Sequence, residues 1–104
     1  IILNFSDGSI GTINYFIDGS KSFPKESLEV FCGGSVLELN NFKSLKGYGW
    51  KNFKKLNLWK QDKGQMNCIS SFIESLNSGK PSIPIDEIFE IAEVTIKIDE
   101  ILRN

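Results

Sequence analysis

The chain has 104 residues, of which 40% are hydrophobic and 24% are charged, as in an ordinary single globular domain. Its net charge of −1 excludes a general electrostatic attraction to nucleic acid or to a membrane surface, and no apolar run is long enough to span a bilayer. Two cysteines, Cys32 and Cys68, are too few for a disulfide framework or a zinc cluster, so we expect reduced thiols in a cytoplasmic protein.

The first residues of the sequence, Ile1-Ile2-Leu3, are apolar, and no initiator methionine precedes them. The ends of natural domains are usually polar and loosely ordered. We therefore expect residues 1–104 to form one domain that belongs to a longer protein.

The first part of the sequence predicts a mostly antiparallel sheet. Segments with alternating apolar residues predict five strands, at residues 1–6, 10–18, 28–32, 36–39 and 53–59. Asp7-Gly8 is typical of a turn between the first two strands, and Gly33-Gly34 predicts a hairpin because glycine adopts positive φ angles. Residues 40–50 are expected to form a loop. The strand at residues 10–18 has apolar residues on both faces, so we expect both to be covered.

After Lys60 the apolar residues recur at helical spacing. Asp62 is a predicted N-cap with Gln65 as its capping-box partner, and Ser78-Gly79 ends this first helix. A second helix is predicted from near Ile85 to the end of the chain. The sequence thus predicts an α+β domain, with a mostly antiparallel open sheet of about five or more strands followed by two helices packed on one face.

The sequence contains no complete catalytic site. It has no histidine, which is the commonest general base and metal ligand. A serine or cysteine nucleophile needs such a base, and no glycine-rich phosphate-binding loop follows a strand. We therefore expect no catalytic, cofactor-binding or metal-binding residue here, and we expect the chain alone to be inactive.

Positive charge is concentrated between Lys43 and Lys63. This segment has seven lysines and one acid, Asp62, and aromatic residues lie among them: Tyr48, Trp50, Phe53 and Trp59. Such a segment can bind anionic sugars or nucleotides by charge and stacking, but the aromatic residues can equally pack on a sheet while the lysines face solvent. The absence of arginine from the segment argues against a nucleic-acid partner.

A second candidate is Gln61-Asp62-Lys63-Gly64 at the start of the first predicted helix. Free amides at a helix N-terminus attract anions, and Lys63 would add positive charge. Simple capping by Asp62 is the structural alternative, and the two roles are compatible.

Several blocks of the sequence resemble, in order, the C-terminal domain of Gfo/Idh/MocA-type oxidoreductases, most closely the bi-domain dehydrogenase branch. These blocks cover nearly the whole chain and are Phe5-Ser6-Asp7-Gly8-Ser9-Ile10-Gly11-Thr12-Ile13, Asp18-Gly19-Ser20, Phe23-Pro24-Lys25-Glu26-Ser27-Leu28-Glu29-Val30-Phe31-Cys32-Gly33-Gly34, Asn41-Phe42, Gly47, Trp50, Lys54-Lys55, Trp59, Gln61-Asp62-Lys63-Gly64, Gly79 and Pro81-Ser82-Ile83-Pro84.

The resemblance implies an NAD(P)-dependent dehydrogenase acting on a sugar or polyol. The family's dinucleotide-binding domain, its Glu-Lys-Pro motif and its acid/base histidine lie upstream of the part that this chain resembles. The implied role here is sheet scaffold, homo-oligomer contact through the open sheet face and part of the substrate cleft. The expected substrate-proximal residues are Tyr48, Trp50, Gln61, Asp62 and Lys63. The alternative hypothesis is a separate module that binds anionic sugars or nucleotides through the segment from Lys43 to Lys63.

Overall fold

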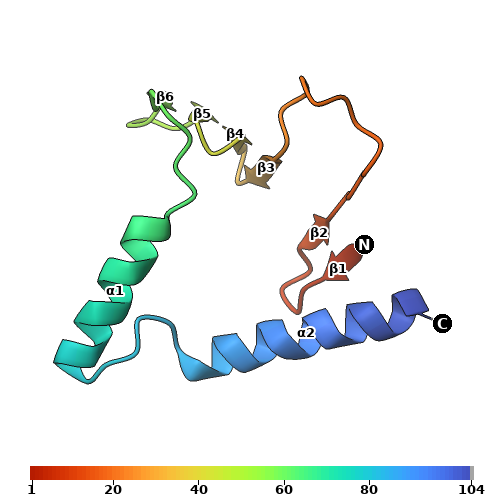
Figure 1. Ribbon diagram of the computed structural model, residues 1–104. Helices are drawn as coiled ribbons and strands as arrows, with labels where there is room; N and C mark the ends of the chain where they lie inside the picture. The colour runs from red at the N-terminus through yellow and green to blue at the C-terminus, as the bar shows by residue number, and fades with distance from the viewer. Residues whose placement is uncertain (104) are drawn as a thin grey trace. The chain divides into compact units, whose positions relative to one another are not determined.

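The computed structural model describes residues 1–103, which form six strands in two antiparallel sheets and two helices (Figure 1). This confirms the α+β class, although the strands form one sheet of two and one of four rather than a single larger sheet. The chain divides into two compact units, one of Ile1–Ile17 with the residues from Asn67 onward and one of Asp18–Met66. Neither helix is long and apolar enough to cross a membrane.

The first unit begins with a short hairpin of β1 (Ile2–Asn4) and β2 (Ile10–Thr12). Its predicted turn is confirmed, since Asp7 Oδ1 accepts hydrogen bonds from the amide and hydroxyl of Ser9, and Gly8 has a φ of 86°. The prediction of a strand over residues 10–18 is wrong beyond Thr12. Ile13 pairs with Ile1, and among residues 1–103 no strand lies opposite the residues that follow.

Both predicted helices are confirmed, as α1 (Gln65–Ser78) and α2 (Ile85–Arg103). Gly79, with a φ of 67°, ends α1 in the left-handed conformation common after helices. Asp86 and Glu87 lie in the first turn of α2 and Arg103 in its last turn, where each charge complements the helix dipole.

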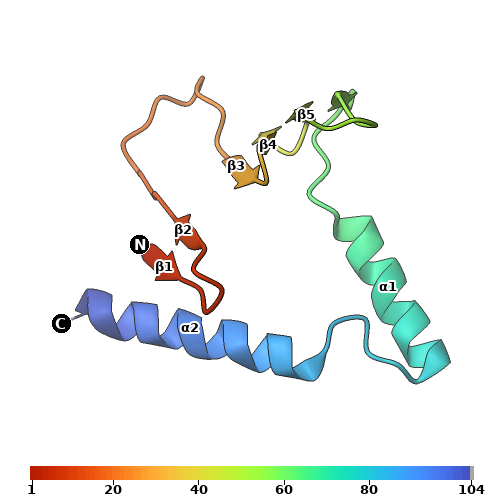
Figure 2. The ribbon, with the colours of Figure 1, turned by 180° about the vertical axis from the view of Figure 1, so that it is seen from behind.

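The second unit contains a meander in which each strand pairs with the next, and Figure 2 shows its strands from behind. Its strands are β3 (Ser27–Cys32), β4 (Ser35–Asn40), β5 (Ser44–Tyr48) and β6 (Lys55–Asn57). Gly33 and Gly34 have φ angles of 55° and 79° and close the β3–β4 hairpin as predicted.

The prediction of a loop over residues 40–50 is wrong, because β5 lies there. Gly47, within the expected loop, is a strand residue that allows close packing. A Cβ atom at Gly47 would lie 2.6 Å from Cδ1 of Phe53 and 3.1 Å from Cδ1 of Trp50. The glycine therefore makes room for two aromatic rings on one face of the sheet.

The two faces of the four-stranded sheet differ in chemistry. The cross-strand register aligns Leu28, Leu39, Leu45 and Leu56 in one row on one face. The opposite face has a charged row of Glu29, Glu38, Lys46 and Lys55 and a polar row of Ser27, Asn40, Ser44 and Asn57. The alternation along each strand thus gives one apolar face and one mostly polar face, and the mostly polar face also carries Phe31, Val36 and Tyr48.

Among residues 1–103 no side chain is fully buried, and the large apolar residues of both helices are at least partly exposed. The elements that contact one another are neighbouring strands. Packing of the two helices on one sheet face therefore stays a prediction.

Candidate functional site

A tight turn between β4 and β5 is the most constrained backbone of the second unit. Lys43 N–H donates to the carbonyl oxygen of Asn40 at 3.0 Å. Asn41 and Phe42 within the turn have φ angles of 51° and 49°. Asparagine tolerates this left-handed region, whereas a bulky phenylalanine rarely adopts it, at a cost on the order of 1–3 kcal/mol. Other contacts must hold the turn in this conformation.

Residues Gln61, Asp62 and Lys63, which we call the 61–63 tether, supply many of those contacts. Gln61 Nε2 donates to both the backbone oxygen and Oδ1 of Asn41, at 2.9 Å each. Asp62 N–H donates to the Phe42 carbonyl oxygen at 3.0 Å. Lys63 Nζ lies 5.8 Å from the centre of the Phe42 ring, within the range of a cation–π interaction. The tether thus binds the backbone oxygens of the turn, the side-chain amide of Asn41 and the aromatic ring of Phe42.

Glu26 fixes the same turn from the other side. Its carbonyl oxygen accepts the Asn41 N–H at 2.6 Å, and its Oε1 pairs with Lys63 Nζ at 2.5 Å. The pair is about one-third exposed on each side chain, so its net contribution is on the order of 1 kcal/mol or less. Glu26 Oε2 is shielded from solvent and has no hydrogen-bond partner among the described residues. Glu26, Asn41 and Lys63 therefore form one connected group.

Asp62 does not act as the predicted N-cap of α1. Its Oδ1 accepts the N–H of Gly64 at 2.8 Å, and the helix begins only at Gln65. Gly64 has a φ of 79°, which turns the chain before the helix begins. The predicted capping box with Gln65 is therefore wrong, because the Asp62 side chain instead accepts the amide of Gly64, two residues later, and closes an Asx-turn.

An open hollow of ≈ 410 Å³, which we call the Asn40 hollow, lies beside this turn. It is lined by Asn40, Asn41, Lys43, Ser44, Asn57 and Leu58. The Leu58 N–H donates to the Lys43 carbonyl oxygen at 2.8 Å and fixes the end of β6 against the turn. The side chains of Asn40 and Ser44 make no hydrogen bond to another residue within 1–103. The hollow therefore offers amide, hydroxyl and ammonium groups and no carboxylate.

Tyr48 is the last residue of β5, and Trp50 follows it, at the end of the strand away from the turn. The Tyr48 hydroxyl donates to Glu38 Oε2 at 3.0 Å, and Trp50 Nε1 donates to the Val36 carbonyl oxygen at 3.1 Å. Ser44 and Tyr48 are four positions apart, about 13 Å along a strand. The structure thus divides the predicted site residues into two groups, one at the 61–63 tether and one at the Tyr48 end of β5. Their substrate-proximal role stays a prediction.

Glu38 is the electrostatic centre of the second group. The hydrogen bond from Tyr48, followed by that from Lys46, lowers the pKa of Glu38 below its ordinary value of 4.5. Lys46 Nζ lies 3.3 Å from Glu38 Oε1. The Tyr48 hydroxyl proton is therefore engaged, and the positive charge of Lys46 is paired with Glu38.

The basic segment is only partly neutralised within the unit. Lys46 and Lys63 pair with glutamates, and Asn57, with its amide oriented to accept, takes a hydrogen bond from Lys55 Nζ at 3.1 Å. The other four lysines of the segment make no ion pair among residues 1–103: Lys43, Lys51, Lys54 and Lys60. Trp59 is 92% exposed, so it does not pack on the sheet. Of these four lysines, only Lys43 lines the Asn40 hollow.

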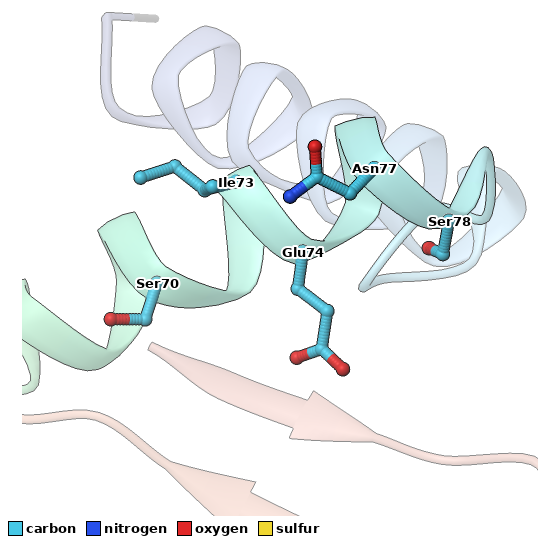
Figure 3. Close-up of a pocket in the computed structure, with 5 residues that line it drawn as sticks. All are labelled: Ser70, Ile73, Glu74, Asn77 and Ser78. Atoms are coloured by element: carbon cyan, nitrogen blue, oxygen red, sulfur yellow. The ribbon is translucent and has the colours of Figure 1, made fainter.

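A second hollow, of ≈ 500 Å³, lies along α1 and carries no comparable chemistry. Figure 3 shows its lining residues on a single helix: Ser70, Ile73, Glu74, Asn77 and Ser78. Because one helix supplies all of them, the hollow has no opposing wall. Nor do residues 1–103 contain a group of three or more Cys, Asp or Glu that could hold a metal ion.

The sequence singled out Gln61, Asp62 and Lys63 as substrate-proximal residues, but it did not indicate the turn that they hold. Asn40, Ser44 and Asn57 were not singled out, although the strand register places them side by side on the polar face. The available signal was the Asn40-Asn41 pair directly after a strand, which is typical of a turn with positive φ. Comparisons of the chain with protein-family models, with curated proteins and with solved structures found no match.

Proposed function

We propose that this chain is the later part of the substrate domain of an NAD(P)-dependent dehydrogenase acting on a sugar or polyol. The observation that carries the proposal is the ordered resemblance of its sequence blocks to Gfo/Idh/MocA-type oxidoreductases. Those blocks include residues that have a structural role in this chain: Gly33 and Gly34 form a turn, Gly47 allows close packing, and the 61–63 tether binds the β4–β5 turn. Because these residues form turns and contacts that define the local structure, they support the proposal that the chain has the fold of that family. We propose the dehydrogenase activity on the same resemblance.

The role proposed for this chain is that of scaffold and oligomer contact. The apolar face of the four-stranded sheet has a row of leucines, of which Leu28 and Leu56 are 55% and 50% exposed. A contiguous apolar sheet face of this kind is typical of an interface. A second copy of the chain, related by twofold symmetry, would cover it.

The cofactor would bind outside this chain. A dinucleotide needs a parallel strand–helix–strand unit with a glycine-rich turn, whereas both sheets described here are antiparallel. The proposal therefore assigns NAD or NADP to an upstream dinucleotide-binding domain. The two free cysteines, Cys32 and Cys68, support a cytoplasmic location.

The test of this function is the protein encoded by the complete reading frame, with the 104-residue chain as its matched control. We expect the longer protein to contain a dinucleotide fingerprint and a Glu-Lys-Pro motif and to reduce NAD or NADP with a sugar or polyol. We expect the chain alone to show no NAD(H) binding by calorimetry. Tight NAD(H) binding by the chain alone, or an upstream sequence without these motifs, would contradict the proposal.

The oligomer contact has its own test in sedimentation velocity of the chain. We expect self-association that is lost in Leu39→Lys, because the lysine would place a charge in the apolar row. Asn40→Lys is the matched control, since the neighbouring position lies on the polar face and should leave association unchanged. A monomeric wild-type chain would contradict this part of the proposal.

A further inference from the structure

We propose that the Asn40 hollow is a binding site for an anionic monosaccharide, that is, a sugar acid or a sugar phosphate. The inference deepens the proposed function, on which the choice of a sugar rests. The site itself is argued from the strand register, the constrained turn and the charges around the hollow.

The register concentrates hydrogen-bonding side chains under the hollow. Asn40 lies opposite Ser44, and Ser44 lies opposite Asn57, on three adjacent strands of one face. Directly opposite residues on a sheet have Cβ atoms about 4.5–5.5 Å apart, which is close to the spacing of hydroxyl groups across a sugar ring. Amide and hydroxyl groups both donate and accept hydrogen bonds, as recognition of several sugar hydroxyls requires.

The charges around the hollow select an anion. Lys43 is the charged residue of the lining, is exposed and makes no ion pair within residues 1–103. Lys55 adds a second ammonium group beside Asn57. The carboxylates of Glu26 and Asp62 do not line the hollow, and one oxygen of each is engaged, by Lys63 and by Gly64. A carboxylate or phosphate at the rim can therefore pair with a lysine that has no competing internal partner.

The strained turn gives this set a fixed geometry. Asn41 and Phe42 keep positive φ angles because Glu26, Gln61 and Asp62 bind their backbone groups. A site whose parts are already held in place loses less conformational freedom when a ligand binds. The volume of ≈ 410 Å³ is within the range of small-molecule pockets, roughly 300–1,000 Å³, and suits one sugar ring.

The test is an amide-detected NMR titration of the 104-residue chain with D-glucuronate and with D-glucose 6-phosphate. D-glucose and acetate are the control ligands. We expect saturable shifts confined to residues 40–44 and 57–58, at roughly millimolar dissociation constants. D-glucose should bind about tenfold more weakly, because it lacks the charge that pairs with Lys43. Tighter binding of one of the two anionic sugars identifies which anion the site takes.

Three variants sharpen the test. Lys43→Ala should weaken glucuronate binding about fivefold and leave glucose binding unchanged, and Asn57→Ala should weaken both. Lys51→Ala is the matched control, because Lys51 is an unpaired lysine of the same basic segment that does not line the hollow. All three positions are exposed, so the variants should keep the wild-type spectrum elsewhere.

Two results would overturn the site. One is the absence of saturable shifts for either anionic sugar, and the other is equal weakening by Lys51→Ala and Lys43→Ala, which indicates diffuse charge attraction. If acetate binds with the same dissociation constant as glucuronate, the sugar hydroxyls contribute nothing to binding, and this also would contradict the proposal. The titration does not involve the upstream sequence, so failure of the dehydrogenase proposal and failure of this site are separate outcomes.

Discussion

Within the two units of the molecule, different kinds of contact stabilise the structure. In the Asp18–Met66 unit, hydrogen bonds join residues far apart in the sequence, such as Lys63 with Glu26 and Gln61 with Asn41. In α1 and α2, the side-chain hydrogen bonds are local, such as Lys97 with Glu93 and Thr95 with Ile91. A long-range network depends on particular side chains, whereas a helix depends mainly on the propensities of many residues. Single substitutions should therefore act strongly in the sheet unit and weakly in the helices.

The units also differ in charge and in their spectroscopic signals. The sheet unit contains nine lysines and five acids, a net charge of +4, whereas the other unit contains three basic and eight acidic residues, a net charge of −5. Both tryptophans, Trp50 and Trp59, belong to the sheet unit. Tryptophan fluorescence therefore monitors unfolding of the sheet unit, and far-UV circular dichroism monitors the helices.

The largest expected effect is that of Gly47→Ala. The added Cβ would lie 2.6 Å from Cδ1 of Phe53 and 3.1 Å from the Phe53 backbone oxygen, so the β5–β6 packing must shift. We expect a loss of about 2 kcal/mol in the free energy of unfolding, measured by urea titration with tryptophan fluorescence. Gly19→Ala is the control, because nothing lies within 4 Å of its added Cβ. Equal effects of the two variants would contradict the account.

A smaller loss is expected for Gln61→Ala. It removes both hydrogen bonds to Asn41 from the tether, and we expect about 1–2 kcal/mol less stability of the sheet unit. Gln65→Ala, at the start of α1, is the matched control and should leave the urea midpoint of the fluorescence signal unchanged. An unchanged midpoint for Gln61→Ala as well would mean that the turn holds without the tether.

A pH dependence should follow from Glu38. Its pKa is lowered in the folded state, so its contribution is present above the ordinary value of 4.5 and is lost as the pH falls through the folded pKa. The urea midpoint of the wild type should therefore fall in this acidic range more than that of Glu38→Gln. Tyr48→Phe should reduce the difference, because the Tyr48 hydrogen bond is the main cause of the shift. Identical pH profiles for the wild type and Glu38→Gln would exclude this role.

The smallest effect is expected in α2. Lys97→Ala removes an exposed ion pair with Glu93, whose atoms are 2.7 Å apart, four residues back along the helix. Pairs of this kind stabilise helices by about 0.3–0.5 kcal/mol, so helicity should fall slightly and the fluorescence midpoint should not move. Lys80→Ala, outside both helices, is the control. A shift of the fluorescence midpoint as large as that caused by Gly47→Ala would contradict the difference between the two units.

The sequence predicted the elements whose signals are local. Both helices followed from apolar spacing and the Gly79 stop, and the β3–β4 hairpin followed from Gly33-Gly34. The errors arose where distant residues decide the outcome. β5 was missed because the sequence does not show that Phe53 packs against Gly47. The strand at residues 10–18 was too long because its apolar pattern continues past the point where its partner strand ends.

The candidate site was predicted only in part for the same reason. Gln61 and Lys63 stood out because they lie at the start of the first predicted helix, but their partners Asn41 and Glu26 are 20 and 37 residues away. The row of Asn40, Ser44 and Asn57 depends on the register of three strands. Register follows from the pairing of whole strands, which single residues do not reveal.

The central claim is that the 61–63 tether holds the strained turn, and amide hydrogen exchange tests it most directly. The informative amides are those of Asn41, bound to Glu26, and Asp62, bound to Phe42. We expect both to be protected in the wild type and to exchange faster in Gln61→Ala, while the amides within β3 and β4 keep their protection. Unchanged protection of Asn41 and Asp62 in Gln61→Ala would contradict the claim.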